Sequence, residues 1–291
     1  MFEELESKRR NCANLTVISI ITFVISFLTI FLSIAYTDNY FLITLGFLIL
    51  IFGFVLMSIS MSRFSKLKKE FKISFLKKAF EERYPGCTYI PDKGLNEDFA
   101  VKSRIIPKSD RYSSNDLIFG EYDGVSFTSA DIHVEERHTT TDSKGHTTTT
   151  YVTIFKGRFF NFSFNKNFKA TTVVNEKGMR VNISRLSKIE LENPDFNKKF
   201  KIHCEDEHTA FYILTPQLMD RMLEIESSNK GKCAFSFIDS NLNYCLNNNI
   251  DTFELSLFKR IDGSILDSMK KDLDFIKTII ETLKINESIF K

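Results

Sequence analysis

Two uninterrupted apolar runs near the start of the chain each predict a membrane-spanning helix. They are residues 15–36 (LTVISIITFVISFLTIFLSIAY) and 40–61 (YFLITLGFLILIFGFVLMSISM), and neither contains Asp, Glu, Lys, Arg or His. A helix of this length is about 33 Å long, which is enough to cross a hydrocarbon core of roughly 30 Å. A buried helix of a soluble protein would rarely be apolar on every face. A cleaved signal peptide is disfavoured, because a second apolar run follows at once.

The short link between the two runs predicts an antiparallel helical hairpin. Only Thr37, Asp38 and Asn39 separate the runs, so both ends of the chain should lie on one side of the membrane. Basic residues flank the hairpin at Lys8–Arg10 and after residue 62, whereas the turn carries only an acidic residue. The positive-inside rule then predicts a two-pass membrane protein with both termini and the main domain in the cytoplasm.

The composition of the spans favours an anchor over a pore or a pump. Neither span has an ionisable residue or the broken-helix pattern of a transporter. A channel remains an alternative only if copies of the chain assemble around a polar Ser/Thr face. Gly46, Gly53 and Ser60 share one helix face, which would let another helix approach closely. Packing within the hairpin is the favoured interpretation of this spacing, and a homo-oligomer is the alternative.

A basic segment follows the second span. Residues 62–80 (SRFSKLKKEFKISFLKKAF) hold seven Lys and Arg and one Glu, whereas the net charge of the whole chain is only +2. Apolar residues recur at near-helical spacing, which predicts an amphipathic helix over 63–84. This helix would bind anionic phospholipid headgroups through Arg63, Lys66, Lys68, Lys69, Lys72, Lys77 and Lys78. A compatible alternative is a topology signal whose apolar stripe packs on the soluble domain. We expect no nucleic-acid binding, because no basic fold motif accompanies the patch.

The remaining residues predict an α+β domain built on a mostly antiparallel sheet. Period-two alternation marks strands at 117–122, 125–137, 151–155, 159–164, 201–204, 210–214, 233–238 and 242–246. Thr215-Pro216 should open a helix that runs to about Glu226, and a longer helix should cover about 264–285. The expected organisation is therefore a stub and hairpin over 1–62, the basic helix over 63–84 and a cytoplasmic domain over 85–291.

A polar segment between two of these strands predicts a projecting ribbon. Residues 138–150 read HTTTDSKGHTTTT, and Asp142-Ser143-Lys144-Gly145 has the chemistry of a β-turn. Pairing outward from this turn sets Thr141 against His146, and the hairpin should cover about 132–156. Both faces are polar, so the ribbon is either a partner-binding arm or a hairpin with no role. If it binds a protein, the candidate residues are His138, Asp142, Lys144 and His146. In this register the two histidines face opposite sides, which disfavours a shared metal site.

Catalytic motifs are scarce in this sequence. We find no glycine-rich phosphate loop, HExxH, GxSxG or CxxC, and no cofactor is expected. The five cysteines are scattered, as is typical of reduced cytosolic thiols. The densest reactive cluster is His203-Cys204-Glu205-Asp206-Glu207-His208, in which His203, Cys204 and His208 are candidate metal ligands. An ordinary strand followed by an acidic turn explains the same residues, and we expect no bound metal.

Three ordered blocks carry a family resemblance. They are FKGRFFNFSFNKNFKATTVV (155–174), KIELENPDFNKKFKIHCEDEHTAFYILTPQLMDRMLEI (188–225) and FSFIDSNLNYCLNNNIDTFE (235–254). In this order they resemble the bacterial family known as domain of unknown function 3137. The resemblance implies a short hairpin in a bacterial plasma membrane, followed by a soluble domain. It implies no activity, and no catalytic residue is carried over. Each block also has a folding explanation, such as Gly157 at a bulge or at a close approach of two backbones.

Two functional hypotheses follow from the sequence. The first is a membrane-anchored cytoplasmic module without catalytic activity that binds an unidentified protein or senses a ligand. The second is an enzyme acting on a membrane-proximal substrate, with the His203–His208 cluster as its metal-dependent centre.

Overall fold

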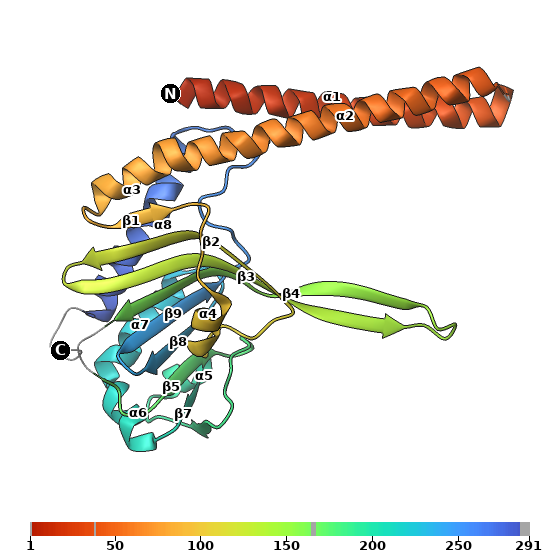
Figure 1. The fold of residues 1–291 in the computed structure, drawn as a ribbon. Coiled ribbons are helices and arrows are strands. Elements are labelled where there is room, and N and C mark those ends of the chain that lie inside the picture. The colour runs from red at the N-terminus through yellow and green to blue at the C-terminus, as the bar shows by residue number, and fades with distance from the viewer. Residues whose placement is uncertain (1, 38, 164–166, 286–291) are drawn as a thin grey trace. The chain divides into compact units, whose positions relative to one another are not determined.

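Two long helices form the first part of the structure, a computed structural model that describes residues 2–37, 39–163 and 167–285 (Figure 1). Helix α1 covers Phe2–Leu32 and continues as a π-helical turn over Ser33–Thr37, and α2 covers Tyr40–Phe71. Asn39 caps α2, since its side-chain oxygen accepts a hydrogen bond from the Phe41 amide at 3.0 Å. Both helices are long and apolar enough to cross a membrane. Asp38, the acidic residue of the expected turn, lies outside the described residues.

The small residues of α2 pack inside the hairpin. A Cβ at Gly46 would lie 2.5 Å from Ile30, and one at Gly53 would lie 2.8 Å from Phe23. Polar side chains cross the same interface, because Ser26 Oγ donates to the Gly46 carbonyl at 2.8 Å. The Thr16 and Ser60 hydroxyls are also 2.8 Å apart. The favoured interpretation of the glycine spacing, packing between the two helices of one chain, is confirmed.

A later segment of the chain joins this helical part. The first compact unit ends at Leu76 and also includes Phe253–Met269. Arg9 Nη1 donates to the Leu257 carbonyl at 2.5 Å, and Glu254 forms ion pairs of 2.6 Å with both Lys68 and Lys72. Helix α2 runs without a break past residue 62 and is followed by a π-helical turn over Lys72–Leu76. Helix α3, Lys77–Arg83, begins the second unit.

The second unit is built on a nine-stranded sheet whose paired strands are all antiparallel. The strand order is β1-β2-β3-β4-β9-β8-β5-β7-β6, so the last two strands of the chain lie in the middle of the sheet. The strands are β1 Thr88–Ile90, β2 Arg111–Tyr122, β3 Val125–Thr141, β4 Thr147–Ser163, β5 Thr172–Glu176, β6 Ser187–Ile189, β7 Phe200–Cys204, β8 Lys232–Ile238 and β9 Asn241–Asn247. With the helices around it, this sheet confirms the expected α+β class. Phe164, the end of one expected strand, lies outside the described residues.

Helices cover both faces of the sheet. They are α4 Glu97–Lys102, α5 Pro194–Lys199, α6 Glu207–Ile213, α7 Pro216–Ser228 and α8 Gly263–Leu283. The predicted capping of α7 is confirmed, since Thr215 Oγ1 accepts from the Leu218 amide. The prediction of a strand at 210–214 is wrong, because α6 occupies most of this range. Asp206 caps that helix by accepting from the Thr209 amide at 2.7 Å, and this cap favours helix over strand.

Alternating residues of the central strands build two different layers. On one face Phe160 of β4 contacts Phe275 of α8 and Tyr244 of β9, with ring centroids 5.5 and 5.8 Å apart. On the other face Phe159 of β4 and Cys245 of β9 belong to an apolar cluster with Ala100, Ile105 and Ile106. Figure 1 shows α4 on this second side and α7 on the opposite side. The sheet is therefore covered on both faces along its central strands.

We predict that Gly157→Ala strongly destabilises the sheet. A Cβ at Gly157 would lie 1.9 Å from the Leu246 carbonyl oxygen of the neighbouring strand, so β4 and β9 would have to separate. The expected loss is about 2–4 kcal/mol of unfolding free energy. Thermal unfolding of the full chain in detergent, followed by circular dichroism, measures it. Gly263→Ala is the control, because a Cβ there meets nothing within 4 Å. Equal melting temperatures for the two variants would contradict the prediction.

Candidate functional site

The outer halves of β3 and β4 form a two-stranded ribbon that runs beyond the rest of the sheet (Figure 1). Every residue from 137 to 150 is exposed, and Thr139 pairs with Thr149. The ribbon begins at a register shift, where Val134 pairs with Phe155 but Glu135 pairs with Thr153. Such a bulge bends a strand and increases its twist. It lies where the two strands leave the sheet.

The turn of the ribbon corrects the expected register by one residue. The Asp142 carbonyl accepts from the Gly145 amide at 3.1 Å, as the β-turn prediction requires. However, the Asp142 amide also donates to the His146 carbonyl at 2.9 Å, so Thr141 pairs with Thr147 and not with His146. Gly145 has a φ of 83° and adds one residue to the loop, which is the usual geometry of a three-residue hairpin.

The four candidate partner-binding residues all lie on this ribbon, but the structure does not bring its histidines together. His138 Nε2 lies 3.3 Å from Glu136, and His146 Nδ1 lies 3.1 Å from Asp142. Asp142 also accepts from the Lys144 amide at 2.9 Å. Each histidine therefore has its own carboxylate partner.

Contacts at its base hold the ribbon against the sheet domain. The Arg111 guanidinium lies 3.3 Å from the centre of the Tyr151 ring. Asp110 accepts from the Arg137 amide at 2.8 Å, and Arg180 forms a 2.7 Å ion pair with Glu136. An isolated two-stranded hairpin is marginally stable in water, so these contacts fix the direction in which the ribbon leaves the sheet.

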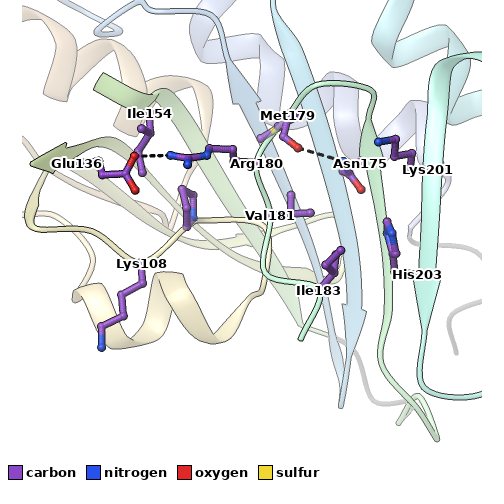
Figure 2. Close-up of a pocket in the computed structure, with 11 residues that line it drawn as sticks. Lys108, Glu136, Ile154, Asn175, Met179, Arg180, Val181, Ile183, Lys201 and His203 are labelled. Carbon is purple, nitrogen blue, oxygen red and sulfur yellow. Dashed lines mark hydrogen bonds and ion pairs between the residues drawn. The ribbon is translucent and has the colours of Figure 1, made fainter. Parts of the chain in front are cut away.

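A pocket of about 320 Å³ lies beside the base of the ribbon, and Figure 2 shows the side chains that line it. Its lining comes from β3, β4, β5, β7 and two loops, and consists of Pro107, Lys108, Glu136, Ile154, Asn175, Met179, Arg180, Val181, Ile183, Lys201 and His203. Asn175 and His203 are buried, with 3% and 6% of their surface exposed. Polar and cationic groups therefore make up much of the wall.

The three candidate metal ligands of the 203–208 cluster are not brought to one site. His203 lines the pocket of Figure 2, whereas His208 is exposed on α6 and lines a different pocket with Phe168 and Tyr212. Cys204 follows His203 in β7 and is buried, and burial raises the pKa of its thiol, with the Glu207 and Asp206 carboxylates adding to this effect. A thiol with a raised pKa is a poor nucleophile and metal ligand at neutral pH.

The cations of the basic segment have different surroundings. Lys68 and Lys72 bind Glu254, and Lys72 is buried. Lys77 lies 3.9 Å from Glu81. The exposed members of the predicted lipid-binding set are Arg63, Lys66, Lys69 and Lys78. The apolar stripe of this segment is buried at Phe64, Leu67, Phe71 and Phe80.

Sequence reasoning missed a buried charged cluster between β2, β3 and β4. Asp131 and Arg158 are paired across β3 and β4, with Oδ1 and Nε 2.9 Å apart. Arg158 Nη2 donates to the Asp116 carbonyl at 3.1 Å, and the Tyr89 hydroxyl donates to the Asp116 carboxylate. The only sequence signal was an aspartate and an arginine within otherwise apolar strand segments. Their partners are remote in the chain, so spacing could not reveal the cluster.

This cluster contains the carboxylates best placed to hold a cation among the described residues. One oxygen each of Asp116, Asp131 and Asp251 lies within 4.8 Å of the other two. The Arg158 guanidinium already supplies a positive charge there, and the Thr252 amide donates to Asp131 at 2.7 Å. We therefore interpret the cluster as a buried ion network that joins three strands to the segment after β9.

Titration of Asp131 should make stability depend on pH. Burial raises the pKa of Asp131 from 3.8 to about 7, despite the opposing effect of Arg158. Between these two values the folded chain therefore keeps a proton on Asp131 that the unfolded chain has released, and Asp131 and Arg158 form a charged pair only as the pH rises above about 7. The contribution of Asp131 to the unfolding free energy is complete below pH 3.8, the pKa of this carboxyl in the unfolded chain, and is lost as the pH rises through about 7. Between these two values it falls by roughly 1.4 kcal/mol per pH unit.

The test compares the wild-type chain with Asp131→Asn, whose side chain does not titrate. The unfolding free energy of the wild type minus that of the variant should fall from pH 4 to pH 7 and then become constant. Thermal unfolding of the full chains in detergent measures this difference, and Asp195→Asn at an exposed position is the matched control. A difference that grows with pH would contradict the assignment.

Comparisons with known proteins give a family match over part of the chain but no activity. Residues 153–285 match the family described as protein of unknown function (DUF3137). The crystal structure of the mycobacterial trehalose monomycolate transport factor A, TtfA, is similar with a TM-score of 0.36 and 5% sequence identity, over 71% of this chain and 93% of that one. Similarity at this level assigns no function. No curated protein matches the chain. The resemblance predicted from the three sequence blocks is confirmed, since the model of the DUF3137 family of unknown function matches residues 153–285.

Proposed function

We propose that this chain is a membrane-anchored interaction module without catalytic activity, which presents the β3–β4 ribbon to a protein partner. The observation that carries the proposal is the ribbon itself, whose residues 137–150 are exposed on both faces while its base is held by Arg111, Asp110 and Arg180. A polar ribbon without a core face adds little to folding. Its fixed direction suits an arm that contacts another molecule.

The anchor part of the proposal rests on the hairpin. Residues 1–62 would hold the chain in a bacterial plasma membrane with both termini in the cytoplasm, because the basic residues flank the spans on one side. Residues 63–84 would contact anionic phospholipid headgroups, chiefly through the exposed Arg63, Lys66, Lys69 and Lys78. Residues 85–291 would form the cytoplasmic domain. Tethering raises the effective concentration of the domain toward partners at that surface.

The enzyme hypothesis has less support. His203 and His208 line different pockets, and the Cys204 thiol has a raised pKa. A metal centre at these residues would need a different arrangement of β7 and α6.

Site-specific crosslinking in native membranes tests the ribbon. A photo-crosslinking amino acid at Lys144 should capture one protein partner, whereas the same amino acid at the exposed Lys230 should not. Capture should be lost when His138–Thr149 is replaced by Asn-Gly, which shortens the ribbon. The captured protein, once purified, should bind the wild-type chain and not the shortened one. The proposal fails if Lys144 captures nothing, or if the purified protein binds both chains equally.

Thiol labelling of intact cells tests the topology. We expect Lys144→Cys to react with a membrane-impermeant thiol reagent only after the membrane is opened, and Asn39→Cys to react without this step. The five native cysteines are buried, so they give a low background. The reverse pattern of labelling would place the sheet domain outside the cytoplasm and contradict the proposed orientation.

A further inference from the structure

The outer half of β4 has a free edge along the ribbon (Figure 1). Strand β4 pairs with β9 from Gly157 onward, so residues 147–153 have β3 on one side and no strand on the other among the described residues. Asn247 closes this edge at its inner end, because its side chain donates to the Ile154 carbonyl at 3.4 Å and accepts from the Lys156 amide at 3.1 Å. A free edge presents unpaired backbone groups to any strand that approaches.

The hydrogen bonds of the turn show which backbone groups of the ribbon face outward. The His146 carbonyl accepts from the Asp142 amide at 2.9 Å, so these two residues form a hydrogen-bonded pair. Such pairs alternate along an antiparallel ladder with pairs whose N–H and C=O groups turn away from each other. Glu135 follows this alternation, since its carbonyl turns away from β4 and accepts from the Asp110 amide at 3.1 Å. The outward-facing residues of β4 are therefore Thr147, Thr149, Tyr151 and Thr153.

The two edges of the ribbon differ in charge. The β4 edge reads TTTTYVT over 147–153, so every residue is β-branched or aromatic and none is charged. Such residues favour strands, and natural proteins usually protect an exposed edge with a lysine or a proline. The β3 edge carries Glu136, Arg137 and His138, and the Arg137 amide is already bound to Asp110 at 2.8 Å. The β4 edge is therefore the one open to a further strand.

We infer that the partner of the ribbon is a second copy of this chain, which pairs with the first along the free edge of β4. This inference rests on the proposed function and names its partner. A two-fold antiparallel pair sets the same segment of both copies opposite itself, so a charged edge would repel its own copy and the uncharged β4 edge does not. Threonine pairs across the strands add to the stability of the dimer. Growth stops at two copies, because the other edge of each ribbon is the charged edge of β3.

The length of the free edge determines the register of the two copies. A centre at Thr149 sets Thr149 opposite itself and Thr147 opposite Tyr151, so these outward-facing residues exchange hydrogen bonds with the second copy. A centre one residue further along β4 would bring the chain that enters the second copy's turn beside Ile154, where the Asn247 side chain already binds the edge. The pair is therefore centred on Thr149.

Cysteine crosslinking of the full chain in native membranes tests this pairing. A centre at Thr149 places the two Thr149 Cα atoms about 5.5 Å apart, which is within the range of a disulfide. Thr149→Cys should therefore form a covalent dimer when the membranes are oxidised with copper phenanthroline. Thr139→Cys is the matched control, because Thr139 lies opposite Thr149 on β3 and would be three strand spacings, or about 14 Å, from its counterpart. The five native cysteines are buried and should not react.

Proline variants separate backbone pairing from accidental contact. Thr147→Pro removes an outward-facing N–H and leaves the ladder to β3 intact. In the Thr149→Cys chain it should lower the yield of covalent dimer roughly tenfold, because the two copies lose two hydrogen bonds. Thr141→Pro, at the opposite position on β3, is the control and should leave the yield unchanged. If a proline variant does not fold, the comparison of Thr149→Cys with Thr139→Cys decides.

The inference is overturned if Thr149→Cys stays monomeric, if Thr139→Cys crosslinks equally well, or if both proline variants lower the yield alike. Capture of a different protein at Lys144, with Thr149→Cys remaining monomeric, would contradict this inference and leave the proposed function intact. If Lys144 captures nothing and Thr149→Cys is also monomeric, both fail. Capture of a second copy at Lys144 is the expected result.

Discussion

The close approach of β4 to β9 at Gly157 is the constraint on which both layers of the sheet domain depend. The Leu246 carbonyl oxygen occupies the space that a side chain at Gly157 would need. With the two strands this close, Arg158 and Phe159 point to opposite faces, one into the buried charged cluster and the other into the apolar layer beneath α4. A wider spacing at this point would loosen the charged cluster and the apolar layer together.

The buried ion pair contributes specificity more clearly than stability. Removing two charges from water is costly, and a buried pair often only balances that cost. However, Arg158 meets Asp131 only when β3 and β4 pair as observed. A slip of two residues would keep the side chains on the same faces but would set Arg158 opposite Ser129 or His133. The pair therefore fixes the register of the two longest strands, from which the ribbon extends.

Local signals in the sequence predicted local structure well. The two long apolar helices, the Thr215-Pro216 cap and the turn at Asp142 needed only neighbouring residues, and all three are present. Errors arose where one residue changed the outcome, as when Gly145 shifted the ribbon register and Asp206 capped a helix in an expected strand. The pocket and the buried charges could not be predicted, because strand order alone brings their members together. Local alternation reports which face a residue occupies but not which strands are neighbours.

The strand order also determines when the sheet can be completed during synthesis. Strands β8 and β9 lie between β4 and β5, although β8 begins only at Lys232, whereas β4 ends at Ser163 and β5 at Glu176. While the ribosome makes these residues, the edges of β4 and β5 lack their final partners, and unpaired edges invite association with other chains. The hairpin has left the ribosome long before this stage. If the hairpin inserts into a bilayer as proposed, the nascent chain meets few other copies in solution, and early insertion would protect the incomplete sheet from aggregation.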